Sequence, residues 1–248
     1  MTAPLRIAMW SGPRNISTAL MYSFAQRPDC AVTDEPFYAA FLAATGAPHP
    51  MRDEVLRHQP TDPKAVIAHI TGPVPGGRPL WYQKHMAHHM VPEFDLSWTA
   101  GFANVFLIRH PARVIRSYAA RREAFEAADL GFAQLHRLFD HIAERTGKVP
   151  LVVDSADIRR DPGNTLALLC QALGIVWDAR MLRWPAGGNA ADGVWARHWY
   201  GSVHRSTGFS GAEGPLPPLD PRFAPILKTA LPHYEALSTH AIGRQGVT

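Results

Sequence analysis

The residues with the clearest chemistry form the run Ser-Gly-Pro-Arg-Asn-Ile-Ser-Thr at positions 11–18. Arg14 carries a planar guanidinium that can direct two donors onto phosphate or sulfonate oxygens and stays charged at any working pH. The hydroxyls of Ser17 and Thr18 can bind the same anion. Because no glycine-lysine pair precedes Ser17, the run differs from the GxxxxGK[ST] loop of nucleotide triphosphatases. It therefore predicts an anion site of another kind.

A second candidate anion site is the run Ile-Arg-His-Pro-Ala-Arg-Val-Ile-Arg-Ser at positions 108–117. Arg109 ends an almost unbroken apolar run that begins at Asn104, which is typical of a central strand. If Arg109 lies at the strand end and Ser117 two turns into the next helix, both face the ligand-binding edge of the sheet. Most of the remaining arginines nearby are interpreted as a solvated basic face; these arginines are Arg113, Arg116, Arg121 and Arg122.

Two groups are candidates for a catalytic base. His85 directly follows the expected strand 80–84, and a histidine there can take a proton from a substrate hydroxyl because its pKa lies near neutrality. Glu35 precedes Pro36 on an expected loop after a strand and is a general base, a substrate anchor or a helix N-terminal carboxylate. Lys84 can neutralise charge on a leaving phosphate oxygen.

The histidines after the third strand also allow other interpretations. His85, His88 and His89 have a spacing that can bind a metal, or that can simply line a helix surface. No cysteine or carboxylate close by in the sequence completes a ligand set. We therefore expect no metal.

The first anion site requires a strand, a tight turn and a helix. Residues 5–10 form a short apolar run that suits a parallel strand covered on both faces. Gly12 and Pro13 interrupt regular pairing, and an amphipathic helix is expected from Ser17 to about Arg27. Such a turn directs unpaired N–H groups and the positive end of the helix dipole at one point. A plain strand-turn-helix, with Ser17 as a simple N-cap, is the alternative.

Further elements alternate along the chain. Strands are expected at 30–33, 80–84, 104–109 and 150–153, and helices at 36–42, 64–70, 110–126, 130–146, 164–173 and 223–237. The tail after Ser238 is expected to fray. Asp154 follows a strand in the manner of a magnesium ligand, but because the first loop has no lysine we interpret Asp154 or Asp157 as a turn and capping residue.

Composition favours one domain over residues 1–248. With 46% hydrophobic residues, 248 residues can bury one substantial core. The net charge of +4 and the pI near 9.3 fit an anionic ligand but are too small to imply nucleic acid. Cys30 and Cys170 lie far apart in apolar contexts, as reduced thiols do. Residues 1–4 are too short for a signal peptide and the tract 166–177 too short to span a bilayer, so a cytoplasmic protein without membrane insertion is expected.

The segment 183–221 differs from the rest of the chain. It is rich in glycine, proline, tryptophan, histidine and arginine, which suits a long irregular loop over a ligand. Donors could come from Arg197, His204 and Arg205. The aromatic residues Trp195, Trp199 and Tyr200 either stack on a base or an aromatic acceptor or form the loop's own small core.

Together the runs at 11–18 and 108–117 and the late glycine-tryptophan-arginine loop resemble the cytosolic-type sulfotransferase superfamily, whose sulfuryl donor is 3′-phosphoadenosine 5′-phosphosulfate (PAPS). The resemblance implies a three-layer, P-loop-type α/β fold with a central, mostly parallel sheet of about five strands flanked by helices. It assigns the 5′-phosphosulfate to the loop residues Gly12, Pro13, Arg14, Asn15, Ile16, Ser17 and Thr18. It assigns the 3′-phosphate to Arg109 and Ser117, with Gly193, Trp195 and Arg197 in a loop that closes over it.

Several positions depart from the family pattern. Lys84-His85 is similar to the lysine-histidine motif that carries the catalytic base, but in the family one residue usually separates the two, which leaves His85, His88 and His89 as alternatives. Some members use a glutamate after the second strand, so Glu35 competes. Arg14 stands where many members have lysine, and Val194 stands where an aspartate is usual.

The resemblance implies sulfuryl transfer to a hydroxyl or amine of a small-molecule acceptor, with adenosine 3′,5′-bisphosphate as product and no metal. Arg14, Lys84 and the loop amides would stabilise charge on the leaving phosphate oxygen. Two other functions stay open: a small-molecule kinase that uses ATP-Mg, with Asp154 on magnesium, and a sulfotransferase-like nucleotide-binding protein that has lost its chemistry. The acceptor and the oligomeric state, a homodimer included, are not determined by these residues.

Overall fold

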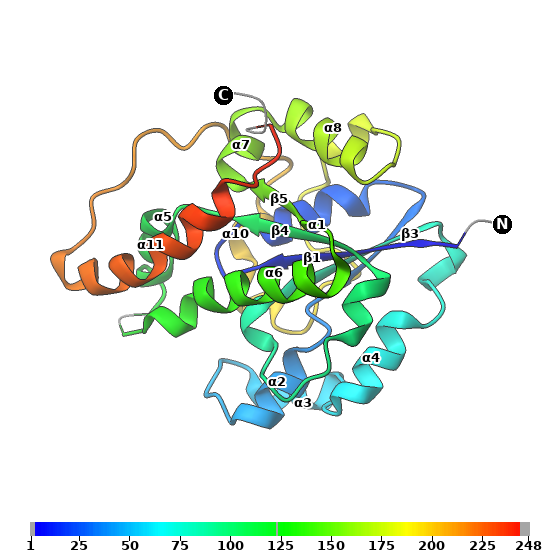
Figure 1. Cartoon of the computed structure of the whole chain (residues 1–248), viewed down its shortest axis with the longest axis horizontal. Helices are drawn as coiled ribbons and strands as arrows, with labels where there is room; N and C mark the ends of the chain where they lie inside the picture. Colours follow the sequence, from blue (N-terminus) through cyan, green and yellow to red (C-terminus); the bar gives the residue numbers. More distant parts are fainter. Residues whose placement is uncertain (1–2, 123, 244–248) are drawn as a thin grey trace.

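The computed structural model describes residues 3–122 and 124–243 as one parallel sheet with helices on both of its faces (Figure 1). Its strands lie in the order β2-β3-β1-β4-β5, and every neighbouring pair runs parallel. Their bounds are β1 Leu5–Ser11, β2 Cys30–Asp34, β3 Leu80–Met86, β4 Ala103–Ile108 and β5 Leu151–Asp154. The predicted α/β fold with a mostly parallel sheet is confirmed.

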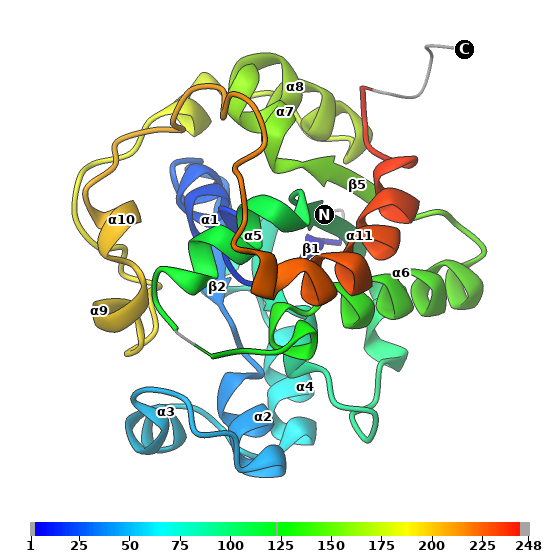
Figure 2. The same cartoon turned by 90° about the vertical axis from the view of Figure 1, so that its left-hand side faces the viewer.

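The helices cover both faces of this sheet (Figure 2). Their bounds are α1 Ser17–Ala25, α2 Tyr38–Thr45, α3 Arg52–His58, α4 Pro63–Thr71, α5 Pro111–Ala119, α6 Phe132–Thr146, α7 Ser155–Arg160, α8 Pro162–Ala172, α9 Ala196–Trp199, α10 Gly201–His204 and α11 Ala224–Ser238. Within the described ranges, none of them has the length and apolar character that a membrane span requires.

The central strand β1 is buried on both faces. Ile7 and Met9 belong to a core cluster that includes Leu20 of α1 and residues of α8. Ala8 and Trp10, which alternate with them, belong to a second cluster that includes residues of α4, α6 and α11. Because both faces of the sheet are covered, its strands are apolar runs rather than alternating ones. The architecture is therefore helix layer, sheet, helix layer.

The strand order determines where a ligand can bind. From β1 the chain crosses to the edge strand β2, returns through β3, and then crosses to β4 on the opposite side of β1. The direction of progress thus reverses at β1, and in open parallel sheets such a point leaves a crevice at the carboxyl ends of the strands. The loop after β1 lies in this crevice, between the ends of β3 and β4.

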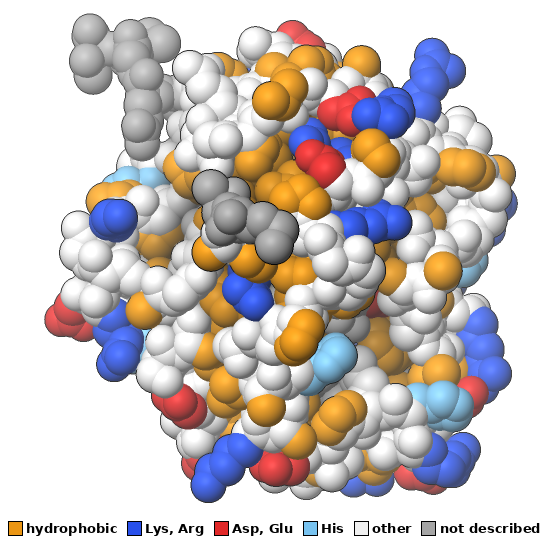
Figure 3. Space-filling model, turned by 90° about the vertical axis from the view of Figure 1, so that its right-hand side faces the viewer, with side chains coloured by type: hydrophobic (Ala, Val, Ile, Leu, Met, Phe, Trp, Pro, Cys, Tyr) orange, Lys and Arg blue, Asp and Glu red, His pale blue; other side chains and the backbone are white. Residues whose placement is uncertain are grey.

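Charged side chains are mixed on the face that Figure 3 shows. Basic and acidic groups lie interspersed there, separated by apolar and neutral surface, rather than gathered into one basic patch.

Both cysteines of the chain, Cys30 and Cys170, are buried free thiols.

Strand β3 is longer than predicted. The sequence predicts its end at Lys84, with His85 beyond it, but β3 continues to Met86. The reason lies in the neighbouring strand, because Trp10 and Ser11 of β1 pair with His85 and Met86 and extend the ladder. His85 is therefore a strand residue.

Two other predicted boundaries are wrong. Helix α5 ends at Ala119 rather than at Glu126, because its last buried apolar residue is Tyr118. The chain after Ser238 does not fray at once, since the Ile242 amide donates a 2.9 Å hydrogen bond to the Val152 carbonyl at the end of the sheet. Residues 244–248 of the predicted tail lie outside the described residues.

Candidate active site

A cavity of about 490 Å³ opens at the carboxyl edge of the sheet. The loop after β1, the ends of β2, β3 and β4, and the chain from α9 to Ser210 form its walls. The sequence-predicted residues that line it are Pro13, Arg14, Asn15, Ile16, Ser17, Thr18, Glu35, Lys84, His88, His89, Arg109 and Ser117. Of the described residues predicted for the site, Gly12, His85, Gly193, Trp195 and Arg197 do not line it.

The loop after β1 has a strained backbone. Arg14 and Ile16 adopt φ angles of 61° and 59°, and for the β-branched Ile16 this conformation is costly. Ile16 rather than Ser17 occupies the N-cap position of α1, and no side chain among the described residues caps this nine-residue helix. Left-handed residues that alternate with residues of negative φ can turn neighbouring N–H groups into one concavity, which suits an anion. The alternative of Ser17 as a simple N-cap is wrong.

The two predicted anion sites touch each other. The Arg14 side chain donates from Nε to Ser117 Oγ at 2.9 Å. In return, Arg109 Nη1 donates to the Arg14 carbonyl oxygen at 2.6 Å. Burial lowers the pKa of Arg14, and the positive charges of Arg121 and Arg109 lower it further. Cations held this close to one another favour the arrival of an anion.

An unpredicted carboxylate lies at the second anion site. Glu213, whose side chain is 5% exposed, pairs with Arg109 Nη2. It also lies 2.7 Å from Arg159 Nη1 and 3.3 Å from Arg113 Nε. Arg113 is therefore not part of the solvated basic face that was predicted for most of these arginines. The signal for Arg159 and Glu213 in the sequence is weak, because both lie far from position 109 along the chain.

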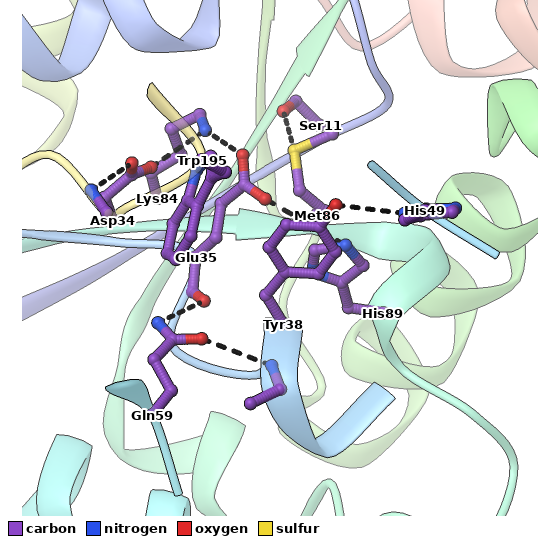
Figure 4. A network of polar contacts seen from close by, with 12 residues as sticks. Ser11, Asp34, Glu35, Tyr38, His49, Gln59, Lys84, Met86, His89 and Trp195 are labelled. Atoms are coloured by element: carbon purple, nitrogen blue, oxygen red, sulfur yellow. Dashed lines mark hydrogen bonds and ion pairs between the residues drawn. The ribbon is translucent and has the colours of Figure 1, made fainter. Parts of the chain in front are cut away.

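A buried ion network holds Lys84 at the end of β3 (Figure 4). Lys84 Nζ donates to Asp34 Oδ1 at 2.9 Å, to Glu35 Oε1, and to the Tyr200 hydroxyl at 2.8 Å. Asp34 and Lys84 are register partners on β2 and β3, so their side chains leave the sheet on the same face. Burial opposes the charge on Lys84, but Asp34 and Glu35 outweigh it and raise the pKa of Lys84. Lys84 therefore remains an ammonium group.

Glu35 is the carboxylate of this network that reaches the cavity. Its φ of 41° turns the chain sharply after β2, and its carbonyl oxygen accepts a 3.2 Å hydrogen bond from Gln59 Nε2. Burial raises the pKa of Glu35; Lys84 opposes this rise and the Asp34 charge adds to it. A carboxylate with a raised pKa is a stronger proton acceptor than an ordinary one. Glu35 therefore has the position and the chemistry of a base.

His85 does not have the predicted position of a base. Adjacent residues of a strand point to opposite faces, so Lys84 faces the cavity and His85 faces the other core. There its ring lies 4.6 Å from that of Trp10 and 5.3 Å from that of Trp98, and burial lowers the pKa of His85 to about 3. In the family motif one residue usually separates the lysine from the histidine, so the histidine would stand at position 86 of this chain. Met86 occupies that position and lines the cavity.

His88, which is half-buried, and His89, which is buried, do line the cavity but are neutral. Burial lowers the pKa of His88 to about 3 and that of His89 well below its ordinary value. The His89 ring stacks on Tyr38 at 4.6 Å, and its Nε2 lies 3.9 Å from Glu35 Oε2. These two histidines form a wall of the cavity beside Glu35.

The predicted phosphate-closing loop supports the Lys84 network instead. Gly193 donates from its amide to Asp34 Oδ2 at 3.4 Å, and the buried Trp195 donates from Nε1 to the Tyr200 hydroxyl at 3.0 Å. Trp195 also belongs to a small core with residues of α2. Arg197 pairs with Glu54 of α3 and has a side chain that is 67% exposed. The assignment of these residues to the 3′-phosphate is not supported by their positions.

Gly12 has a packing role. A Cβ atom at this position would lie 2.6 Å from the Leu130 carbonyl oxygen, which is closer than any side chain tolerates. The absence of a side chain lets the chain before α6 pass directly against the loop after β1.

Asp154 is a capping residue, as predicted. Its carboxylate accepts the Ala156 amide at 2.9 Å at the start of α7 and the Tyr234 hydroxyl at 2.7 Å. Across the described ranges, no three His, Cys, Asp or Glu side chains are grouped so as to hold a metal ion.

A family model described as sulfotransferase domain matches residues 5–241. The chain belongs to this sulfotransferase family. Among solved structures, this sulfotransferase-family chain is similar to the sulfotransferase domain of the Synechococcus PCC 7002 olefin synthase, with a TM-score of 0.55, 20% identity, and coverage of 92% of this chain and 95% of that one. It is also similar to a sulfotransferase from Alicyclobacillus acidocaldarius, with a TM-score of 0.52, 13% identity, and coverage of 97% and 98%. These likenesses show the fold.

Two curated relatives come from Arabidopsis thaliana. Branched-chain-amino-acid aminotransferase-like protein 1 is 38% identical over 97% of this chain, and protein 2 is 35% identical over 94%. The sulfotransferase-family chain covers only 43% and 41% of their lengths. It thus spans about two fifths of the curated relatives that it matches.

Proposed function

We propose that this member of the sulfotransferase family transfers a sulfuryl group from PAPS to a hydroxyl or amine of a small molecule. The observation that supports the proposal is the junction of two anion seats. The loop residues 13–18 and the pair Arg109 and Ser117 border one cavity and touch through Arg14. A ligand with phosphate groups at separate positions can use both seats at once.

Polar groups without partners make the two seats suitable for the donor. The first turn of α1 has N–H groups but no capping side chain among the described residues. Nε of Arg109 is a buried donor that has no hydrogen-bond partner in the described part of the chain, so it is available to a phosphate oxygen. When bound, the donor supplies an activated sulfuryl group. Arg14 and the α1 amides would hold its 5′ end, and Arg109 and Ser117 its 3′-phosphate.

Glu35 is the proposed base. Its carboxylate accepts the proton of the acceptor hydroxyl or amine while the acceptor oxygen or nitrogen bonds to sulfur. Lys84 holds this carboxylate in place and balances the charge of Asp34. As the bond between sulfur and the phosphate oxygen breaks, Arg14 and the loop amides stabilise the charge that builds on that oxygen.

The acceptor would bind in the other half of the cavity. Its walls there are mainly aromatic and apolar, with neutral imidazoles among them: Tyr38, Phe41, Ala47, His49, His88, His89 and Trp199. Such walls favour a small acceptor with an apolar body. The names of the Arabidopsis relatives add branched-chain amino acids to the acceptors that deserve a test.

Calorimetry with two nucleotides tests the donor. Adenosine 3′,5′-bisphosphate is expected to bind more tightly than ATP-Mg, because only the bisphosphate fills both seats. A preference for ATP-Mg would refute the proposal and favour a kinase.

Transfer itself needs a separate assay. The protein is incubated with ³⁵S-labelled donor and a panel of phenols, alcohols, amines and branched-chain amino acids, with Glu35→Gln as the matched inactive control. Label in a product of the wild type but not of the variant supports the proposal. Tight bisphosphate binding with no labelled product across the panel would favour a nucleotide-binding protein that has lost its chemistry.

A further inference from the structure

We infer that Glu213 occupies the 3′-phosphate seat as an internal anion, which the donor has to displace in order to bind. The inference rests on the proposed function and adds to it a residue that sets donor affinity. Neither the sequence motifs nor the family match point to this glutamate.

The contacts of Glu213 are those expected of a bound phosphate. Its carboxylate pairs with Arg109, Arg113 and Arg159, and its side chain is almost fully buried between them. Arg109 and Arg159 also line the main cavity, whereas Glu213 does not. A charged carboxylate is the side chain that best imitates a phosphate oxygen pair in front of an arginine.

The segment that carries Glu213 has few other attachments. From Phe209 to Asp220 the described chain contains no helix or strand, and most of its residues are exposed. In Figure 2 this segment descends across α5 before it enters α11. Its contacts around Glu213 come from the same arginines, since Arg159 Nε donates to the Gly211 carbonyl at 3.2 Å and Arg113 Nη1 to the Glu213 carbonyl at 3.2 Å. The segment is therefore held in place by an anion-binding cluster.

A donor phosphate and the Glu213 carboxylate compete for the same cations. A phosphate on Arg109 and Ser117 would lie beside a buried like charge, which is unfavourable. A second cavity of about 340 Å³ borders Glu213 and lies against Arg116 and Pro217, so the displaced side chain has space to enter. When only a fraction of molecules has Glu213 displaced, the apparent donor affinity falls by that fraction.

Removal of the charge on Glu213 tests this competition. Calorimetry of wild type and Glu213→Gln measures the affinity for adenosine 3′,5′-bisphosphate and for adenosine 5′-phosphate, which lacks the 3′-phosphate. Glu144→Gln, which removes an exposed carboxylate on α6, controls for the change in net charge. Thermal melts with and without ligand show that each protein is folded.

Glu213→Gln is expected to bind the bisphosphate at least about tenfold more tightly than wild type, with no change for adenosine 5′-phosphate and no effect of Glu144→Gln. A structural role alone would lower stability and weaken binding, so tighter binding is specific to competition. Unchanged or weaker bisphosphate binding in Glu213→Gln, with wild type binding normally, overturns the inference and leaves the proposed function standing. Absence of bisphosphate binding in both proteins overturns the proposed function and the inference together.

Discussion

Arg109 donates a 2.6 Å hydrogen bond from Nη1 to the backbone carbonyl oxygen of Arg14. The bond joins the end of β4 to the loop after β1, and Arg14 completes the connection by donating to Ser117 of α5. The two proposed anion seats are therefore one structural unit. A change at Arg109 acts on the second seat directly and on the first through the loop backbone.

Replacement of Arg109 by alanine is expected to weaken bisphosphate binding by about 100-fold, because each lost hydrogen bond between charged groups costs about 1.5–3 kcal/mol. The loss for adenosine 5′-phosphate should be at least about tenfold smaller, since Arg109 reaches the first seat only through the Arg14 carbonyl. Calorimetry measures both. Arg197→Ala, which breaks only an exposed pair with Glu54, serves as control and should change neither affinity. Equal losses for the two nucleotides in Arg109→Ala would contradict the assigned role.

Glu35→Gln should lower kcat at saturating donor by about 100-fold or more, the usual contribution of a positioned base. Asp34→Asn is the matched control, because Asp34 also binds Lys84 but does not line the cavity. Its kcat should fall far less. His85→Ala should keep most of the wild-type kcat, since His85 faces the opposite core. Full activity of Glu35→Gln would remove this residue as the base.

Stability is expected to fall in acid. The pKa values of His85 and His88 are about 3 in the folded protein, against 6.5 for an ordinary histidine. Between these values the unfolded chain binds protons that the folded chain does not, so the free energy of unfolding decreases as the pH falls from 6.5 toward 3. Denaturant titrations at several pH values measure the slope. It should be shallower for His85→Ala, and an identical slope would show that His85 is accessible to protons.

Gly12→Ala should destabilise the fold by about 1–3 kcal/mol, because the new methyl group would overlap the Leu130 backbone. Gly101→Ala is the control, since a Cβ there meets no atom within 4 Å. Its effect should stay within about 0.5 kcal/mol. Urea unfolding of the two variants compares them, and equal stabilities would mean that the chain around Leu130 yields without cost.

Local sequence was sufficient to predict those elements whose positions depend only on their own residues. The apolar runs of β1 and β4 require cover on both faces, and Gly12-Pro13 can only end a strand, so the strand, the turn and helix α1 could be predicted together. The order of the two arginine runs then predicted two anion sites at one edge of the sheet. Asp154 as a capping residue follows from the same local rules.

Side-chain direction was harder to predict where it depends on a neighbouring strand. His85 looked like a residue beyond a strand because Lys84 is charged, yet β1 continues beside it and keeps both in the ladder. The alternation of the strand then separates Lys84 from His85. Knowledge of the pairing between β1 and β3 would have identified Met86, rather than His85, as the residue on the cavity side.

The sequence by itself determined the parallel α/β fold and pointed to the two runs proposed as anion seats, because both depend on contiguous residues. Only the tertiary structure showed which distant groups complete them. Tyr200 and Asp34 meet at Lys84, and Arg159 and Glu213 meet at Arg109, across separations that no local pattern encodes. The physical reason is that buried charges require opposite charges or hydrogen bonds, and the fold brings these partners from wherever the chain returns to the carboxyl edge of the sheet.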